Sequence, residues 1–420
     1  MTDWKTVIEK EWQQRQAGVP HGILFPLITQ SFDAREIIAA VETLLTGRLT
    51  MGERVREYEQ QFAEFIGSKY AVMVNSGSSA NLLAMTVAAN PQRAKRLRPG
   101  DEVLVPSVCW STSVWPILQM GLVPVFVDIE LNTLNADLTD MKKRLTPRTR
   151  GVMAVHVLGN STPMGALLDF VRDHDLILIE DTCESLGSRY KDHYLGALGD
   201  LGTYSFYYSH HITTGEGGMV VCNDPDDYNL LLCLRSHGWS RPLSNRAALE
   251  RENPQIDPRF LFVNVGYNLR PLEVQAAFGL CQLGRLNTMN AIRNENKSRL
   301  AQVLQAHPRW NGQFIFPSAA PDTTPAWFGL PCLLHEDLQQ THRQYLDYLT
   351  AHGVENRPIV SGNFVRQPAL RLHGLNYDPL AFPSAEIINR RGFFIGVHTE
   401  RIEDSILQQV ADTMLGYEFR

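Results

Sequence analysis

The chain has 420 residues, of which 44% are hydrophobic and 20% are charged, and its formal net charge at pH 7 is -6. This composition excludes a disordered, collagenous or coiled-coil chain, and the negative charge disfavours a protein that tracks nucleic-acid phosphates. The basic residues include only eight lysines, and no lysine lies between Lys191 and Lys297. We therefore expect a globular, enzyme-sized protein with a large buried core.

The first segment, MTDWKTVIEKEWQQRQ, carries charges of both signs and no apolar stretch, so it does not resemble a signal peptide. No apolar run approaches the roughly 18 residues that a membrane helix needs. These features predict a cytoplasmic protein. The six cysteines are scattered without a CxxC pair, which predicts buried thiols rather than disulfides or a zinc site.

Short apolar runs alternate with helix-like segments between residues 70 and 225. Runs this short and apolar are typical of strands buried on both faces, so we expect a mostly parallel sheet covered by helices. Serines that can cap a helix precede a predicted helix over 78–90. The predicted fold is therefore α/β, with strands at 71–74, 102–106, 124–129, 151–157, 176–181, 202–207 and 218–222.

The pattern becomes continuously helical over 271–305, which is long enough to bridge two domains. Strand and helix candidates resume after the Pro-rich stretch 317–325 and indicate a smaller α+β domain. We predict a large, cofactor-binding domain at residues 1–290, including an N-terminal extension, and a small C-terminal domain at 291–420.

Two motifs lie where an α/β sheet binds ligands. SGSSAN (76–81) follows a predicted strand and opens a helix, so it is either a phosphate-binding helix N-terminus or simply a capped helix. Asp181 ends the predicted strand LILIED, where its carboxylate can hold a protonated ring nitrogen or cap a helix. The residues alone leave both pairs of alternatives open.

Many further motifs occur in the same order as in one known family. They include LTMGERVREYEQQFAEFIG, VNSGSSANLLA, VPSVCWSTS, IEDTCESLG, GALGDLGTYSF, GEGGMVV, RSHGW, GYNLRPLE and ENRPIV. With these motifs the chain resembles the DegT/StrS sugar aminotransferases, which depend on pyridoxal phosphate (PLP), over nearly its whole length. The resemblance implies an aspartate-aminotransferase-like fold of PLP type I, with a central, mostly parallel sheet and a smaller C-terminal α+β domain.

The chain departs from this family at one position. The family motif S-F-x-x-x-K ends in the lysine that binds PLP as a Schiff base, whereas Ser205 and Phe206 are here followed by His210. Because imidazole carries no primary amine but remains an acid and base, we predict that the cofactor acts as pyridoxamine phosphate (PMP). Histidine at this position resembles the PMP-dependent nucleotide-sugar 3-dehydratases, and the overall likeness favours those of the colitose pathway, which use GDP-4-keto-6-deoxymannose.

The resemblance also implies roles for individual residues. His210 is the catalytic base and then the acid for the departing hydroxyl at sugar carbon 3, and L-glutamate restores PMP afterwards. Asn268 matches a residue supplied by the neighbouring subunit, which implies a homodimer with shared active sites. For the cofactor ring, the resemblance implies that Asp181 pairs with the ring nitrogen, Trp110 stacks on the ring and Glu184 contacts the ring hydroxyl. The implied phosphate contacts are Ser78, Ser79 and Ser205. The implied substrate contacts are His237 and Arg357.

Other interpretations remain at this stage. A distant lysine could replace the missing one and give a PLP-dependent aminotransferase, or the change could leave a cofactor-free binding protein. The CDP-4-keto-6-deoxyglucose 3-dehydratases also have the histidine but bind an iron–sulfur cluster through clustered cysteines. The segment SRPLSNRAALE after RSHGW holds no cysteine, so we predict neither this cluster nor a metal. His156 and His398 are interpreted as structural, and the residues that read the nucleotide base are not predicted.

Overall fold

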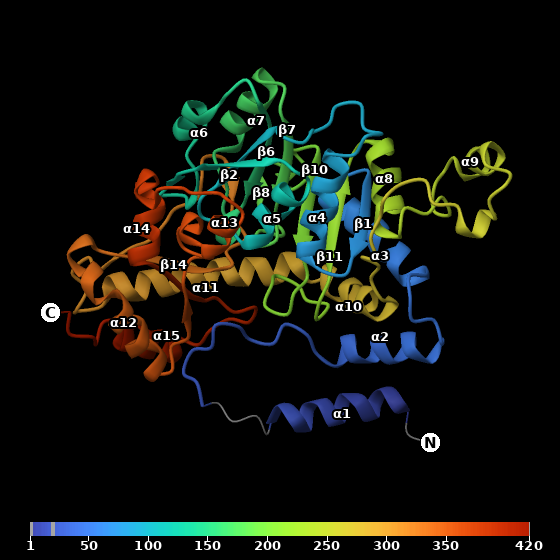
Figure 1. Cartoon of the computed structure of the whole chain (residues 1–420). Helices are drawn as coiled ribbons and strands as arrows, with labels where there is room; N and C mark the ends of the chain where they lie inside the picture. The colour runs from blue at the N-terminus through green and yellow to red at the C-terminus, as the bar shows by residue number, and fades with distance from the viewer. Residues whose placement is uncertain (1–2, 18–21, 420) are drawn as a thin grey trace.

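The computed structural model describes residues 3–17 and 22–419, and its centre is a seven-stranded sheet (Figure 1). The strands lie in the spatial order β1-β11-β10-β7-β6-β2-β3, and only β11 runs antiparallel to its neighbours. All seven predicted strands form, as β1 (Tyr70–Val74), β2 (Glu102–Pro106), β3 (Val123–Val127), β6 (Thr149–Val155), β7 (Ile177–Asp181), β10 (Leu201–Ser205) and β11 (Gly218–Cys222).

Each face of this sheet is covered by helices, which explains why the strands are continuously apolar. In β1, Val72 and Val74 enter one core while Ala71 and Met73 enter another, as the two-residue period of a strand requires. The predicted helix over 78–90 is confirmed as α4 (Gly77–Ala88). Further helices around the sheet are α3 (Glu53–Ile66), α5 (Ser111–Gln119), α6 (Leu138–Arg144), α7 (Met164–Asp173) and α8 (Pro225–Arg235).

The predicted helical stretch 271–305 is two helices rather than one. α10 (Glu273–Leu283) ends at Gly284, and α11 (Leu286–Ala306) begins two residues later. The first turns of α11 pack into a core of the large sheet, whereas Leu300 and Leu304 pack into the core of a second sheet. α11 therefore bridges the two cores, as the length of the helical pattern predicts.

The second sheet is antiparallel, with the order β12-β14-β16-β15. Its elements are β12 (Phe314–Ile315), β14 (Gly329–Leu334), α12 (His342–Ala351), β15 (Asn356–Arg357), α13 (Pro368–Leu372), α14 (Pro383–Arg391), β16 (Gly392–Gly396) and α15 (Asp404–Met414). The minor strands elsewhere are β4 (Ile129–Glu130), β5 (Asn135–Ala136), β8 (Arg189–Tyr190), β9 (His193–Tyr194) and β13 (Thr323–Thr324), and α9 (Arg246–Glu252) projects from the large domain (Figure 1).

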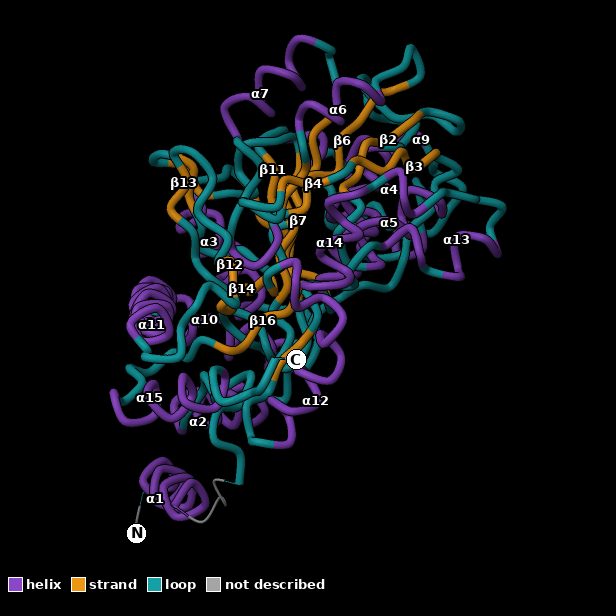
Figure 2. Tube along the Cα trace, turned by 90° about the vertical axis from the view of Figure 1, so that its left-hand side faces the viewer, coloured by secondary structure: helices purple, strands orange, loops and turns teal. Residues whose placement is uncertain are grey.

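The N-terminal segment reaches both cores. α1 (Trp4–Ala17) lies beside α2 (Ala34–Leu45) at the edge of the molecule (Figure 2). Between them, Phe25 is buried in the core of the small sheet and pairs with Val354. The division at residue 290 stays a prediction, and this part of the extension packs with the smaller domain. None of the helices in the two described ranges is long and apolar enough to span a membrane.

Candidate active site

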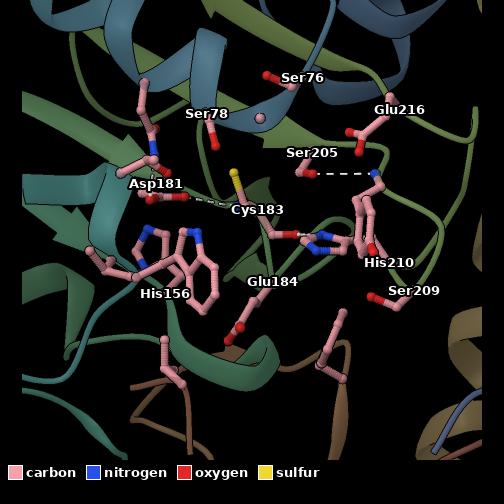
Figure 3. A pocket seen from close by; sticks show the side chains of 18 residues that line it. Ser76, Ser78, His156, Asp181, Cys183, Glu184, Ser205, Ser209, His210 and Glu216 are labelled. Atoms are coloured by element: carbon pink, nitrogen blue, oxygen red, sulfur yellow. Dashed lines mark hydrogen bonds between the residues drawn. The ribbon is translucent and has the colours of Figure 1, made fainter. Parts of the chain in front are cut away.

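A cavity of about 480 Å³ opens at the carboxyl ends of β6, β7 and β10, where α/β sheets bind ligands (Figure 3). Six of the predicted site residues line it: Ser78, Trp110, Asp181, Glu184, Ser205 and His210. The sequence thus places residues from distant motifs at one site, and the fold brings them together.

One wall of the cavity is the N-terminus of α4. Ser76 caps the helix by accepting a hydrogen bond of 3.1 Å from the backbone N–H of Ser79. A Cβ at Gly77 would lie 2.5 Å from Cβ of Ser205, so only glycine lets the helix approach β10 this closely. This contact gathers free N–H groups with the hydroxyls of Ser78 and Ser205, which together can bind a phosphate. Ser79 does not line the cavity, and its predicted phosphate contact stays a prediction.

Asp181, at the end of β7, also lines the cavity and is only 4% exposed. Its Oδ2 accepts hydrogen bonds from Nδ2 of Asn81 at 2.8 Å and from Oγ of Ser113 at 2.7 Å. Its Oδ1 accepts the backbone N–H of Cys183 at 3.2 Å. The carboxylate is therefore anchored by several donors and still reaches the cavity.

His210, in the loop after β10, is held by residues of two other segments. Its Nδ1 lies 2.7 Å from the carbonyl oxygen of Cys183. Because a carbonyl only accepts, Nδ1 carries the hydrogen and the neutral ring keeps a free lone pair on Nε2. The ring of Phe328 packs edge-on against the imidazole, with 5.2 Å between the ring centroids. Burial lowers the pKa of His210 to about 4, so the ring is a neutral base at pH 7.

Glu184 lines the cavity next to these groups. Its Oε2 accepts the backbone N–H of Leu158 at 3.0 Å. Burial, with a smaller effect of the nearby Asp181 charge, raises the pKa of Glu184 to about 7. This carboxyl group can therefore hold a proton near neutral pH and donate a hydrogen bond to a ligand.

Three predicted site residues lie away from the cavity. Asn268 is exposed and accepts a hydrogen bond from Nε of Arg270 at 3.1 Å. His237 lies on the same surface, because Ser236 pairs with Asn268. Arg357 is exposed on β15 and donates to the carbonyl of Asn356. The structure thus separates these residues from the cavity of their own chain.

The remaining histidines divide between two positions. His156 lines the cavity, and its Nε2 lies 3.1 Å from Oε2 of the buried Glu180. His398 lies outside the cavity, with Nε2 at 2.9 Å from the carbonyl oxygen of Pro26. Both have structural partners, as their interpretation as structural residues requires.

Sequence reasoning missed part of the cavity wall. Asn81 carries a signal in hindsight, because it follows Ser78 by three residues and shares its helix face. Phe328 and Val360 come from the part of the chain that follows α11, and no local pattern places them in the cavity. The other unpredicted lining residues are Ser76, Gly77, Thr112, Val155, Cys183, Tyr207, Ser209 and Glu216.

The lysines and cysteines bear on the alternatives. No lysine is among the described residues that line the cavity. Lys191 and Lys297, which flank the lysine gap, lie over the rings of Tyr190 and Trp327 instead. The six cysteines are free thiols, and the described ranges contain no group of three His, Cys, Asp or Glu side chains placed to hold a metal ion.

The donor set fits a phosphorylated pyridine. The glycine-dependent helix N-terminus with its serine hydroxyls suits the phosphate, and the anchored Asp181 suits a protonated ring nitrogen. Trp110, which is 57% exposed at the cavity wall, offers an aromatic face for stacking. Fold and site together define a vitamin-B6-dependent enzyme of fold type I.

The chain belongs to the DegT/DnrJ/EryC1/StrS aminotransferase family, whose model matches residues 30–415. It is 38% identical to GDP-4-keto-6-deoxy-D-mannose 3-dehydratase of Escherichia coli O55:H7 over 91% of this chain and 98% of that protein. A GDP-4-keto-6-deoxymannose-3-dehydratase structure of a histidine-to-asparagine mutant with bound GDP-perosamine has a TM-score of 0.85 and 36% identity, covering 92% of this chain and all of that one. Another, with a trapped PLP-glutamate geminal diamine, has a TM-score of 0.85 and 35% identity, covering 93% of this chain and 100% of that chain.

Proposed function

We propose that this protein is a PMP-dependent lyase that removes the C3 hydroxyl of GDP-4-keto-6-deoxymannose and yields a 4-keto-3,6-dideoxy sugar. The observation that carries the proposal is His210, which occupies the cavity where the family has its lysine and presents a free Nε2. The relatives at 38% and 36% identity, which act on this substrate or bind a GDP sugar, support the substrate class. L-Glutamate as the amino donor is supported by the relative that holds it.

The geometry supports the proposed roles of the residues. The bound cofactor supplies an amine that joins the keto sugar and a ring that withdraws electrons. His210 takes a proton from the carbon beside that amine through Nε2, and passes it to the hydroxyl that leaves carbon 3. The low pKa of about 4 makes the protonated imidazole a strong acid for this second transfer. Asp181 keeps the ring nitrogen protonated, Trp110 stacks on the ring, and Glu184 donates to the ring hydroxyl.

The structure disfavours the alternative reactions. An aminotransferase needs a lysine at the cofactor, and the two lysines that flank the gap are engaged with Tyr190 and Trp327 outside the cavity. A dehydratase with an iron–sulfur cluster needs cysteines close to the site. Of the six cysteines only Cys183 lines the cavity, within the part of the chain that the structure describes.

We further propose that the active enzyme is a homodimer with shared sites. Three carboxylates, those of Asp181, Glu184 and Glu216, line the cavity, and no arginine or lysine is among the described lining residues. The proposed phosphate, pyrophosphate and glutamate ligands are all anionic, and cationic side chains for them would come from another surface. The surface around Asn268 offers such groups beside exposed apolar side chains: His237, Arg241, Arg270, Phe262, Val265 and Leu272.

The first experiment tests the reaction and its base. We expect the purified protein, with PLP, glutamate and GDP-4-keto-6-deoxymannose, to release ammonia, 2-oxoglutarate and a product lacking one oxygen atom, measured by mass spectrometry. His210→Asn, which keeps a polar side chain but no base, should form none of this product. His193→Asn, at an exposed histidine, should leave it unchanged.

The same assay separates the alternatives. A 4-amino sugar as the product would support an aminotransferase, and full activity of His210→Asn would assign the base elsewhere. CDP- and dTDP-4-keto-6-deoxy sugars in parallel reactions test the nucleotide, and we expect the GDP sugar to react fastest.

A further inference from the structure

Two buried polar side chains that donate hydrogen bonds to Asp181 do not themselves take part in the proposed reaction. Asn81 on α4 is 1% exposed and Ser113 on α5 is fully buried. Both contact the same oxygen of Asp181, with Nδ2 of Asn81 at 2.8 Å and Oγ of Ser113 at 2.7 Å from Oδ2. Burying two polar side chains is costly unless their hydrogen bonds are satisfied, so this arrangement calls for an explanation.

The direction of each hydrogen bond follows from the chemistry of the groups. An ionised carboxylate only accepts, so Asn81 must present its NH₂ group and Ser113 its hydroxyl hydrogen. The amide oxygen of Asn81 then needs a donor, and Oγ1 of the fully buried Thr203 lies 2.6 Å from it. The orientation of the Asn81 amide is thus fixed from both ends.

These contacts leave one oxygen of Asp181 for a ligand. Oδ2 is occupied by two side-chain donors, whereas Oδ1 accepts the backbone N–H of Cys183 at 3.2 Å. The Cys183 thiol also interacts with this carboxylate, but neither of the side chains that fix Oδ2 contacts Oδ1, and Asp181 lines the cavity. We propose that Asn81 and Ser113 are positioning residues that hold Asp181 with Oδ1 aimed at the ring nitrogen of the bound cofactor.

Helix α4 carries residues for two different contacts. Its first turn carries Ser78 at the phosphate end of the cavity, and its second turn carries Asn81 beneath the carboxylate. The rise of a helix is about 1.5 Å per residue, so one rigid element sets the spacing between the phosphate contact and the ring-nitrogen contact. Positioning by buried groups on rigid elements is how a site keeps its geometry to a fraction of an ångström.

The test compares two ligands that differ at one atom. The inference rests on the proposed function, because it concerns PMP in this cavity. The dissociation constants of PMP and of its 1-carba analogue, with C–H in place of the ring nitrogen, are measured by fluorescence for the wild type, Asn81→Ala and Ser113→Ala. We expect each variant to bind PMP about tenfold more weakly, which is the loss of one hydrogen bond to a charged group, while the analogue loses no affinity.

Two control variants make the comparison specific. Ser111→Ala, on the same helix as Ser113 and outside the cavity lining, should leave both dissociation constants unchanged. Ser113→Thr keeps the hydroxyl and should retain most of the preference for PMP. Equal weakening of both ligands in Asn81→Ala and Ser113→Ala would show a general structural role and overturn the inference.

The Asp181→Ala variant distinguishes a failure of the positioning inference from a failure of the proposed cofactor contact. If it abolishes the preference for PMP while Asn81→Ala and Ser113→Ala retain it in full, the positioning inference is wrong and the proposed function stands. If the wild type binds neither ligand, or if Asp181→Ala keeps the preference, the cofactor contact itself is wrong, and the inference fails with it.

Discussion

His210 and Glu184 line the same cavity, and burial acts on them in opposite directions. It lowers the pKa of His210 to about 4 and raises the pKa of Glu184 to about 7. The cause is the same in both, since a site with little water disfavours whichever form is charged. Near pH 6 both groups are therefore neutral, one as a base and the other as a hydrogen-bond donor.

Glu184 makes the stability of the protein depend on pH. In the folded protein its carboxyl keeps the proton up to about pH 7, whereas in the unfolded chain it loses the proton near 4.5. The folded state binds more protons between these values, so the free energy of unfolding falls as the pH rises. We expect the free energy of unfolding of the wild type to fall by roughly 3 kcal/mol or less relative to that of Glu184→Gln as the pH rises through this range.

Urea unfolding of the cofactor-free protein at a series of pH values measures this difference. His210 contributes in the opposite sense, but it is present in both proteins and cancels from the comparison. Glu9→Gln, at an exposed position, should run parallel to the wild type. A constant difference between the wild type and Glu184→Gln from pH 4 to 8 would contradict the assigned ionisation, since the pH range spans roughly the whole titration.

His210→Lys tests whether the cavity still fits a lysine. We expect this variant to form a bond with PLP that borohydride reduces, because a lysine amine buried here is largely neutral and nucleophilic. Peptide mapping by mass spectrometry should find the adduct at position 210, and none in the wild type. An adduct at Lys297 in the wild type would instead support a lysine acting from a distance.

At the scale of elements, the chain after α11 supplies a wall of the active site. Phe328 precedes β14, lines the cavity and packs edge-on against His210. Its backbone N–H donates to the carbonyl of Leu158, in the turn that follows β6. In that turn Gly159 has φ +89, and a Cβ there would lie 1.9 Å from the carbonyl oxygen of Ala326. Glycine therefore allows the two segments to meet, and their contact places Phe328 on the base.

Phe328→Ala should raise the pKa of His210 from about 4 toward its ordinary value of 6.5, because water then reaches the imidazole. The carbonyl of Cys183 and the charge of Asp181, which raise this pKa, and the charge of Arg293, which lowers it, remain in place. NMR titration of the His210 ring measures the change. Phe316→Ala, which removes a ring packed against the core of the small sheet, is the control and should leave the value unchanged. An unchanged titration in Phe328→Ala would show that other groups exclude the water.

At the scale of the whole molecule, the proposed dimer concerns two residues that do not line the cavity of their own chain. Asn268 and His237 lie instead beside exposed apolar side chains. A two-fold dimer would bring this surface to the cavity of the partner and cover the apolar groups. In the proposed dimer catalysis and dimerisation are linked, because each site would take residues from both chains.

Complementation between two inactive variants tests this arrangement. His210→Asn and Asn268→Ala should each be inactive or strongly impaired alone. After unfolding and refolding together, random pairing makes half of the dimers mixed, and each mixed dimer has one intact site, so we expect about a quarter of the wild-type activity. Activity no higher than the sum of the separate variants would mean that Asn268 does not act in the partner's site.

The sequence by itself determined the features that depend on local pattern. The seven strands and α4 follow from short apolar runs and from a serine cap, which are readable residue by residue. Asp181 is placed by its position at the end of a strand, because the carboxyl ends of parallel strands share one edge of the sheet, whereas His210 is placed by the resemblance to the family motif. The resemblance to the family showed the exchange of lysine for histidine at position 210, and with it implied the kind of reaction.

Only the tertiary structure decided the rest. The structure showed the break between α10 and α11. It also showed two contacts between segments about a hundred residues apart, that of Asn81 with Asp181 and that of Phe328 with His210. The absence of Asn268 from the lining of its own cavity is likewise a property of the fold. Such contacts arise from packing between elements, which no local periodicity encodes, because the same side chain can face a core, a cavity or a partner.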